Sequence, residues 1–384
     1  MAHFDWKSTI RANIFTLRTM GLWPKHNRKY EFNLYLLYAF VVIFFFAVVH
    51  ILTLAINVFF IYNNFDALMK TTYILVTELL SLVKIYFFTR NIQIVKQLLT
   101  MLDKKPFQPR TVIQKVLIER DLKLWTQMYS MLWVSCIAAL LFWAIFPILD
   151  GSYREGQLPF LAWYPFDFGV TPMYQITYVY QILSTSVVAM CTSNIDTFLA
   201  ALNLFAGAQF DVLCDNLKQL NLCEDDSKSK EDLKICFQHH REILSFGESI
   251  NKFLDWIVFF QFFASAVTIG LAMFQLTVIA PFSSEFYSVI SFGGAVIVEI
   301  FMYCWYGNEL TLKSRNLAYA IFEADWSMAS IEVKRLLIFF MLRSQKEFTV
   351  SPFNLFQLSL ETFIKILKTG WSYFALVHSV NIQY

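Results

Sequence analysis

Long apolar stretches alternate with polar connections along the whole chain. Seven of these stretches approach or exceed the roughly 20 residues that a helix needs to cross the hydrocarbon core of a bilayer. Several are longer than a bilayer requires, which predicts tilted helices or helices that continue beyond the membrane. The sequence therefore predicts an all-α membrane protein with seven transmembrane helices, at residues 34–62, 68–88, 128–149, 173–205, 253–282, 286–306 and 353–380.

Basic side chains are distributed unequally between the connections that join these stretches. The N-terminal segment and the connections after the second, fourth and sixth stretches carry nearly all the Lys and Arg residues, whereas the alternate connections carry only Lys70 and Arg154. The positive-inside rule therefore places the N-terminus in the cytoplasm, and seven crossings leave the C-terminus extracellular. This orientation is opposite to that of a G-protein-coupled receptor.

The connections on the predicted inner side are long and helical in pattern. Apolar residues recur at helical spacing in 233–247 and 331–342, so we expect helices that pack together as a cytoplasmic anchor module. The outer connection mixes prolines with aromatic residues, which suits either an interfacial aromatic belt or an ordered lid. The predicted division is a cytoplasmic N-terminal segment (1–33), spans 1–4 with the outer loop 150–172 (34–205), a cytoplasmic amphipathic connection (206–252), spans 5–6 (253–306), a cytoplasmic helical segment (307–352), and span 7 with a short extracellular C-terminus (353–384).

Composition agrees with a membrane protein and offers little enzyme chemistry. Only 16% of the residues are charged, against about 25% in soluble domains, and a net charge of +2 argues against a nucleic-acid partner. The six cysteines lie in predicted spans or inner connections, so no structural disulfide is expected. His239 and His240 have no partners at metal spacing, and we expect them at the solvent edge of an inner helix. The sequence predicts no enzyme, no cofactor and no metal site.

A few ionisable residues and a glycine pair interrupt the predicted spans. They include His50, Glu78 and Lys84 in the first two spans, and such groups usually face protein or water. Gly293-Gly294 is expected to allow close packing of two helices. Four further charged residues lie toward the inner ends of their spans, and we expect them below the hydrocarbon: Asp196, Glu299, Glu361 and Lys365.

The outer halves of spans 2, 3, 4 and 6 are rich in aromatic residues with a few hydroxyls and amides. Such walls, with almost no full charge, suit a pocket for a neutral, apolar small molecule. The alternative is that these residues only pack helix against helix. The candidate binding residues are Tyr73, Thr77, Ala139, Phe142, Trp143, Tyr174, Thr177, Tyr178, Gln181, Tyr287, Ile290 and Ser291.

Three parts of the chain make it resemble an insect odorant receptor. One is the outer-loop stretch LPFLAWYPFD, and the second is YCWYGNEL at the end of span 6 followed by ADW. The third, the C-terminal third of the chain, is the most specific. The stretches are residues 158–167; 303–310 with 324–326; and 336–342, 358–363 and 372–376.

The resemblance implies a ligand-gated, non-selective cation channel that passes ions such as sodium, potassium and calcium. It implies a heterotetramer with a shared odorant co-receptor, in the plasma membrane of olfactory sensory neurons, with membrane lipid around it and a neutral volatile as ligand. Span 7 would line the central pore with Tyr373, Leu376 and Ser379, and Leu376 would form the hydrophobic constriction. The connection after span 4 is short, which resembles an odorant-tuned subunit rather than the co-receptor.

Three other classes of protein compete with this interpretation. A gustatory receptor of the same superfamily shares the topology, but the outer halves hold few Asp, Glu, Asn and Gln residues for a sugar site. A secondary transporter usually shows inverted repeats and interrupted helices, and neither is visible here. A G-protein-coupled receptor requires the opposite orientation.

Overall fold

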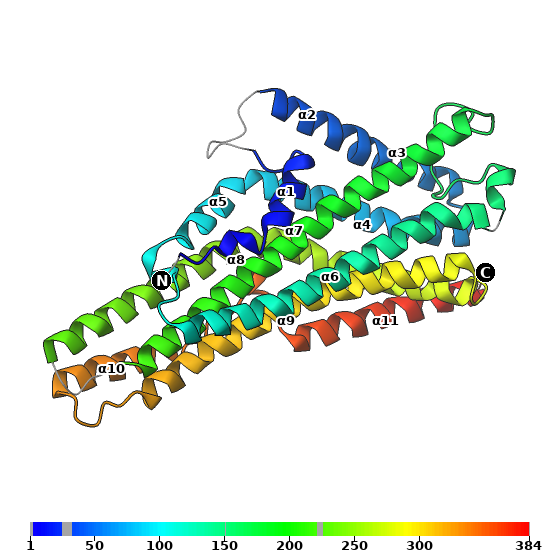
Figure 1. Cartoon of the computed structure of the whole chain (residues 1–384). Coiled ribbons are helices and arrows are strands. Elements are labelled where there is room, and N and C mark those ends of the chain that lie inside the picture. The colour runs from blue at the N-terminus through cyan, green and yellow to red at the C-terminus, as the bar shows by residue number, and fades with distance from the viewer. Residues whose placement is uncertain (1–2, 25–32, 150, 221–225, 384) are drawn as a thin grey trace.

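The computed structural model describes residues 3–24, 33–149, 151–220 and 226–383. The remaining positions, which belong to the predicted N-terminal segment, outer loop, inner connection and C-terminus, lie outside the described residues. The described chain folds into an elongated bundle of helices, without strands (Figure 1). The longer elements are α1 (Arg11–Thr19), α2 (Leu34–Val42), the π-helix η2 (Ile43–Val48), α3 (Val49–Ile61), α4 (Phe65–Arg90), α5 (Ile92–Met101), α6 (Val112–Leu149), α7 (Met173–Lys218), α8 (Asp226–Val278), α9 (Ser284–Glu323), α10 (Ile331–Ser344) and α11 (Leu360–Gln383), and the short 3-10 helices are η1 (Trp6–Ser8), η3 (Lys105–Phe107), η4 (Ser152–Glu155) and η5 (Pro352–Asn354).

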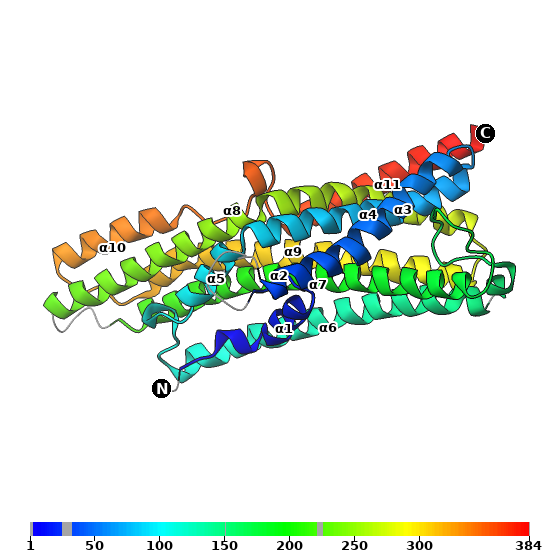
Figure 2. The same ribbon diagram turned by 90° about the horizontal axis from the view of Figure 1, so that it is seen from above.

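Six helical stretches in the described residues have the length and hydropathy to cross a membrane. They are Leu34–Ile61, which joins α2, η2 and α3, together with α4, α6, α7, α8 and α9. A seventh helix, α11, lies beside α8 and α9 (Figure 2) and is less apolar, because it carries Glu361, Lys365 and Lys368. The predicted all-α membrane fold is confirmed.

The last predicted span begins later than the sequence indicated. Residues 353–359 do not belong to the helix, because Phe353 and Asn354 both adopt left-handed backbone angles with φ of 49° and 57°. Two successive left-handed residues cannot continue a right-handed helix. The helix itself starts at Leu360.

Two helices continue far beyond the predicted membrane boundaries. With 46 residues in α7 and 53 in α8, these helices are about 70 and 80 Å long, well over the roughly 30 Å of a hydrocarbon core. The predicted inner connection is therefore mostly the end of α7 and the beginning of α8. These extensions meet α9 and α10 at one end of the bundle, here named the α10 end. The opposite end, the loop end, carries residues 151–172 and the end of α11 (Figure 1).

The main hydrophobic core lies toward the α10 end and includes the N-terminal segment. Trp6, Ile10 and Leu17 are fully buried there, because η1 and α1 pack along α7. A smaller apolar cluster lies near the loop end, around Tyr73 and Trp143.

The paired histidines of α8 are buried, so the prediction of a solvent-edge position was wrong. His239 donates from Nε2 to Oε1 of Gln209 over 3.1 Å, and its ring lies edge-on against Phe107. His240 packs against Phe340 of α10. The burial comes from residues of η3, α7 and α10, which the pattern of α8 alone does not reveal.

Close helix packing occurs at Gly270 and Gly370 and not at Gly293-Gly294, which corrects the prediction for that pair. A Cβ atom at Gly270 of α8 would lie 2.7 Å from the Cβ of Tyr373 and 2.8 Å from the carbonyl oxygen of Gly370. At Gly293 a Cβ atom would make only an ordinary 3.9 Å contact, and at Gly294 nothing lies within 4 Å. The absence of a side chain therefore matters where α11 lies against α8.

We expect Gly270→Ala to lower the stability of the fold by about 1–3 kcal/mol, because the new methyl group meets backbone atoms that cannot move aside. The matched control is Gly294→Ala, whose methyl group enters open space and gains helix propensity of up to about 1 kcal/mol. The apparent melting temperature of the purified protein measures both. Equal melting temperatures for the two variants would contradict the close contact between α8 and α11.

The burial of His239 predicts a stability that falls in acid. This residue lies outside the predicted span 253–282, and burial, followed by the charge of Arg110, lowers the pKa of His239 from 6.5 to about 3. Because the unfolded chain takes up a proton below pH 6.5 and the folded chain does not, stability is full above that pH and is lost as the pH falls toward 3. At pH 5 this residue alone lowers the free energy of unfolding by about 2 kcal/mol relative to neutral pH.

Chemical unfolding of the wild-type protein and of His239→Gln at pH 7 and pH 5 measures this effect. The variant should lose less stability between the two pH values. His3→Gln serves as the control, since His3 is exposed, and its pH dependence should equal that of the wild type. An unchanged acid sensitivity in His239→Gln would exclude His239 as its source.

Candidate ligand-binding site

A cavity of about 110 Å³ lies between α4, α6, α7 and α9. These helices contain the predicted spans 2, 3, 4 and 6. Apolar and aromatic side chains make up most of its wall, and hydroxyl and carboxyl groups interrupt that wall from α4, α7 and α9. The lining residues are Ile74, Thr77, Glu78, Leu132, Cys136, Ala139, Leu140, Trp143, Thr185, Val188, Ala189, Thr192, Ser193, Phe292, Ala295, Val296 and Glu299.

Three of the candidate binding residues line this cavity, namely Thr77, Ala139 and Trp143. A fourth, Tyr73, packs beside it, with its ring edge-on to Phe292 at a centroid distance of 5.4 Å. These four candidates come from α4 and α6, and the contact of Tyr73 with Phe292 adds α9 to the same space.

The other candidates from α6 and α9 lie nearer the bundle surface. The rings of Phe142 and Tyr287 stack on each other at 6.0 Å, and Tyr287 is exposed. Ile290 is exposed and Ser291 is half-buried. On α9 the cavity is lined instead by residues that begin at Phe292, farther from the loop end.

Two of the candidates from α7 bond the loop that precedes this helix. The amide of Gln181 bonds both backbone groups of Phe160, accepting from its N–H over 3.1 Å and donating to its carbonyl over 3.0 Å. The Tyr174 hydroxyl donates to the carbonyl of Gln157 over 2.7 Å. The buried ring of Phe160 then lies edge-on against Trp143 at 5.1 Å.

The remaining two α7 candidates do not bond the loop. The Tyr178 hydroxyl donates to the carbonyl of Ala144 in α6, and Thr177 is buried. Phe160, Ala162 and Tyr164 of the loop are buried, whereas Leu161, Phe166 and Val170 are exposed. The loop therefore packs partly onto the bundle, and its role as a lid stays a prediction. Gln181 connects it through Phe160 to Trp143 of the cavity wall.

A buried ion cluster borders the cavity on the side of the α10 end. Lys84 of α4 bonds Asp196 of α7 over 2.8 Å and Glu299 of α9 over 2.5 Å. The hydroxyl of Tyr303 donates to Asp196 over 2.8 Å. The expectation that Asp196 and Glu299 simply lie below the hydrocarbon missed this arrangement, in which a cation inside the bundle compensates both carboxylates.

Two carboxyl groups therefore lie in the wall of this cavity, whereas the pocket expected from the outer halves of the spans was nearly uncharged. Glu299 contributes to both the cavity and the cluster. Glu78, which also lines the cavity, lies 3.3 Å from Nε2 of His50 and next to the hydroxyl of Thr185. The sequence marked these charged residues as unusual inside spans, but it gave no sign that helices far apart in sequence bring them together.

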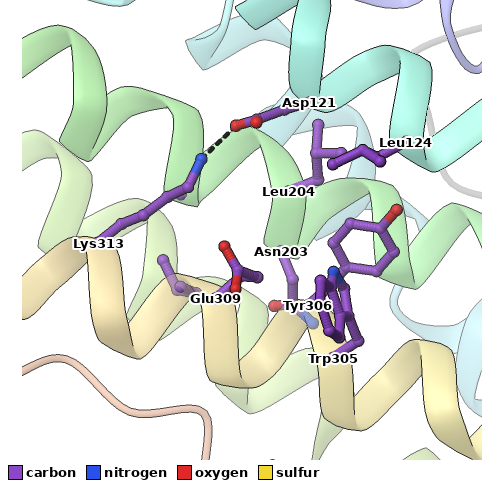
Figure 3. Close-up of a pocket in the computed structure, with 10 residues that line it drawn as sticks. Asp121, Leu124, Asn203, Leu204, Trp305, Tyr306, Glu309 and Lys313 are labelled. Carbon is purple, nitrogen blue, oxygen red and sulfur yellow. Dashed lines mark hydrogen bonds and ion pairs between the residues drawn. The ribbon is translucent and has the colours of Figure 1, made fainter. Parts of the chain in front are cut away.

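A second cavity, of about 40 Å³, lies nearer the α10 end between α6, α7 and α9. Figure 3 shows Lys313 reaching Asp121 across this space, and its ammonium group also bonds Asp211 over 2.5 Å. A single water occupies about 30 Å³ in the liquid, so this polar space suits water-sized occupants. It is too small for a volatile organic molecule.

The candidate pore residues follow one another along α11. Tyr373 is half-buried against α8, Leu376 is 61% exposed, and Ser379 is exposed and donates from its hydroxyl to the carbonyl of Leu376 over 2.7 Å. The exposure continues along the helix through Lys365 and Lys368. This strip of mixed polarity has no partner within the described part of a single chain.

The described residues contain no group of three or more His, Cys, Asp or Glu side chains placed to hold a metal ion. Five of the six cysteines are described and all five are free thiols, while Cys223 lies outside the described residues. What the site offers is a mostly apolar space beside buried charged groups. Its chemistry is that of binding.

Comparison with known proteins identifies the family. The 7tm odorant receptor family model matches residues 64–370. Odorant receptor 46a, isoform A, of Drosophila melanogaster is 24% identical over 375 residues, which cover 95% of this chain and 96% of that protein. Odorant receptor Or1 of Anopheles gambiae is 22% identical over 416 residues, which cover 99% and 97%.

A solved structure has the same fold. The insect olfactory receptor OR5 from Machilis hrabei, in complex with eugenol, superposes with a TM-score of 0.83 at 16% identity, over 98% of this chain and 100% of that one. Because the family model covers most of the chain, the protein belongs to the odorant receptor family. It is a multi-pass membrane receptor and not an enzyme. Membership decides against the gustatory receptor, transporter and G-protein-coupled receptor alternatives.

We expect Lys84→Met to destabilise the protein by about 3–5 kcal/mol, because it leaves two buried carboxylates without their cation. Lys70→Met is the control, since Lys70 pairs with Glu285 in a partly exposed position, where an ion pair is worth about 1 kcal/mol or less. The yield and melting temperature of purified protein measure both variants. If the triple variant Lys84→Met, Asp196→Asn, Glu299→Gln failed to recover stability relative to the single one, uncompensated charge would not be the cause.

Proposed function

We propose that this protein is an odorant-tuned subunit of a ligand-gated, non-selective cation channel, and that a small volatile binds in the cavity between α4, α6, α7 and α9. The observation that carries the proposal is the cavity itself. It is lined mainly by apolar and aromatic side chains, and Phe160 of the loop packs against Trp143 in its wall. The related OR5 structure contains eugenol, which is consistent with a small organic ligand here.

The ligand contacts would come from Thr77, Ala139 and Trp143 in the wall and from Tyr73 beside it. The α7 candidates Tyr174, Thr177, Tyr178 and Gln181 would act through the lid and the α6–α7 contact, while Phe142, Tyr287, Ile290 and Ser291 would form the surface side of the site. A cavity of 110 Å³ is somewhat smaller than an engineered 150 Å³ cavity that binds benzene. The preferred ligand is therefore small, or the cavity widens as it enters.

The pore would be lined by α11, from four subunits around a central axis, with Leu376 as the constriction. The exposed strip from Lys365 to Ser379 supports this role, because a helix with polar groups on an unpartnered face is unsuited to lipid. The partners would be an odorant co-receptor subunit, membrane lipid, and permeating sodium, potassium and calcium ions.

The orientation would follow the distribution of basic residues. The N-terminus and the α10 end would face the cytoplasm, and the loop end would face outward in the plasma membrane of an olfactory sensory neuron. In this arrangement a volatile reaches the lid from the side on which odorants arrive.

Opening would require that the ligand bind the open arrangement more tightly than the closed one. Reversal from about 1% to about 99% open needs about 5.5 kcal/mol of differential binding. Burial of ~200 Å² of apolar ligand surface provides roughly 5 kcal/mol in total. The free energy that ligand burial provides is close to the free energy that opening requires. We therefore expect modest affinity, and partial opening by poor ligands.

We expect Leu376→Ala to raise the resting current several-fold in cells that also express a co-receptor, because a smaller side chain widens and hydrates the constriction. Leu183→Ala is the control, since Leu183 is 49% exposed but lies on α7, away from α11. Whole-cell recording before and after a volatile panel measures both. Unaltered resting and evoked currents in Leu376→Ala, with normal surface expression, would exclude Leu376 as the gate.

A further inference from the structure

One oxygen of a buried carboxylate lacks a hydrogen-bond partner at the proposed ligand cavity. Glu78 is 4% exposed and lines the cavity from α4. Its Oε1 atom lies 3.3 Å from Nε2 of His50 and accepts from the hydroxyl of Thr185 over 3.5 Å. Its Oε2 atom is buried without a partner among the described residues.

A buried carboxylate oxygen without a donor costs a free-energy penalty that a ligand can remove. A ligand hydroxyl can supply the missing donor. Oε2 of Glu78 therefore suits a ligand that donates a hydrogen bond.

The charges around the cavity favour a donor over an acceptor. Three carboxylates, Glu78, Asp196 and Glu299, lie in or next to its wall, and the ammonium of Lys84 reaches only the last two. His50 contacts Glu78 on the Oε1 side and leaves Oε2 facing no donor. A carboxylic acid would meet like charge here, and an ester, ketone or ether would bring no donor.

We propose, building on the proposed ligand-binding function, that this receptor recognises small alcohols or phenols: an apolar body packed against Trp143 and Phe292, with a hydroxyl that donates to Oε2 of Glu78. The apolar body supplies most of the buried area. The hydroxyl contact decides which volatiles of a given size are bound.

Pairs of isomers test this specificity, because the two members of each pair share one molecular formula and only the alcohol has a hydrogen-bond donor. The pairs are benzyl alcohol and anisole, cyclohexylmethanol and methoxycyclohexane, and hexan-1-ol and 1-methoxypentane. Binding to the purified full-length protein is measured by calorimetry, and evoked current is measured separately in cells with co-receptor. At least one alcohol should bind about tenfold or more tightly than its ether, as expected for a hydrogen bond to a charged acceptor.

The variant Glu78→Gln should reduce that ratio to near one, because the amide keeps the size of the side chain and loses the charge. The matched control is Thr77→Val on the same helix. Thr77 also lines the cavity, but its hydroxyl already donates to the carbonyl of Ile74 over 2.8 Å, so this change should shift both isomers equally. If Glu78→Gln fails to fold, the ratio of alcohol to ether affinity of the wild-type protein still tests the proposal.

Equal affinity of the isomers for the wild type would overturn the proposal, as would a ratio retained in Glu78→Gln or a failure of all three alcohols to bind. A donor preference in binding without any evoked current would support the ligand class and contradict the channel function. A current evoked equally by both isomers would support the channel function and contradict the ligand class.

Discussion

A single ammonium group shared by two carboxylates joins three helices in the interior of this protein. Lys84, Asp196 and Glu299 come from α4, α7 and α9, and their side chains are withdrawn from solvent together. Each of these charges alone would carry a desolvation penalty of several kcal/mol. The three charges compensate one another only when the three helices have the correct axial positions. The cluster therefore fixes the register of these helices, and with it the position of the walls of the neighbouring cavity.

The position of this cluster links ligand binding to helix arrangement. Glu299 lines the cavity with part of its side chain and bonds Lys84 with one oxygen. A ligand in the proposed site that displaced Glu299 would act on a bond that holds α4 to α9. The connection spans one side chain, so no extended pathway through the protein is required.

The sequence predicted the elements well and the contacts between them less well. Apolar stretches of 20 residues or more identify helices because length and hydropathy are local properties, and the same four helices predicted for the pocket surround the cavity. The depth at which the cavity lies in the bundle could not be predicted, because it depends on packing between helices. The sequence does not reveal whether Phe142 and Tyr287 stack on each other or face a void. The burial of His239 depends likewise on Phe107, which belongs to another element. The ion cluster could not be predicted for the same reason, because the periodicity of one helix does not identify which residues of other helices pack against it.

The unbroken length of α8 has a mechanical consequence for α11. Its 53 residues run from the α10 end to the loop end, where Gly270 places its backbone directly against that of Gly370. Because the two helices touch through their backbones at this point, a tilt of α8 would press on α11 and move it as well. Over a rod of about 80 Å, a rotation of about 3° about one end displaces the other by about 4 Å. If α11 lines a pore as proposed, substitutions at the α10 end, remote from the proposed ligand site, would therefore alter the diameter of that pore.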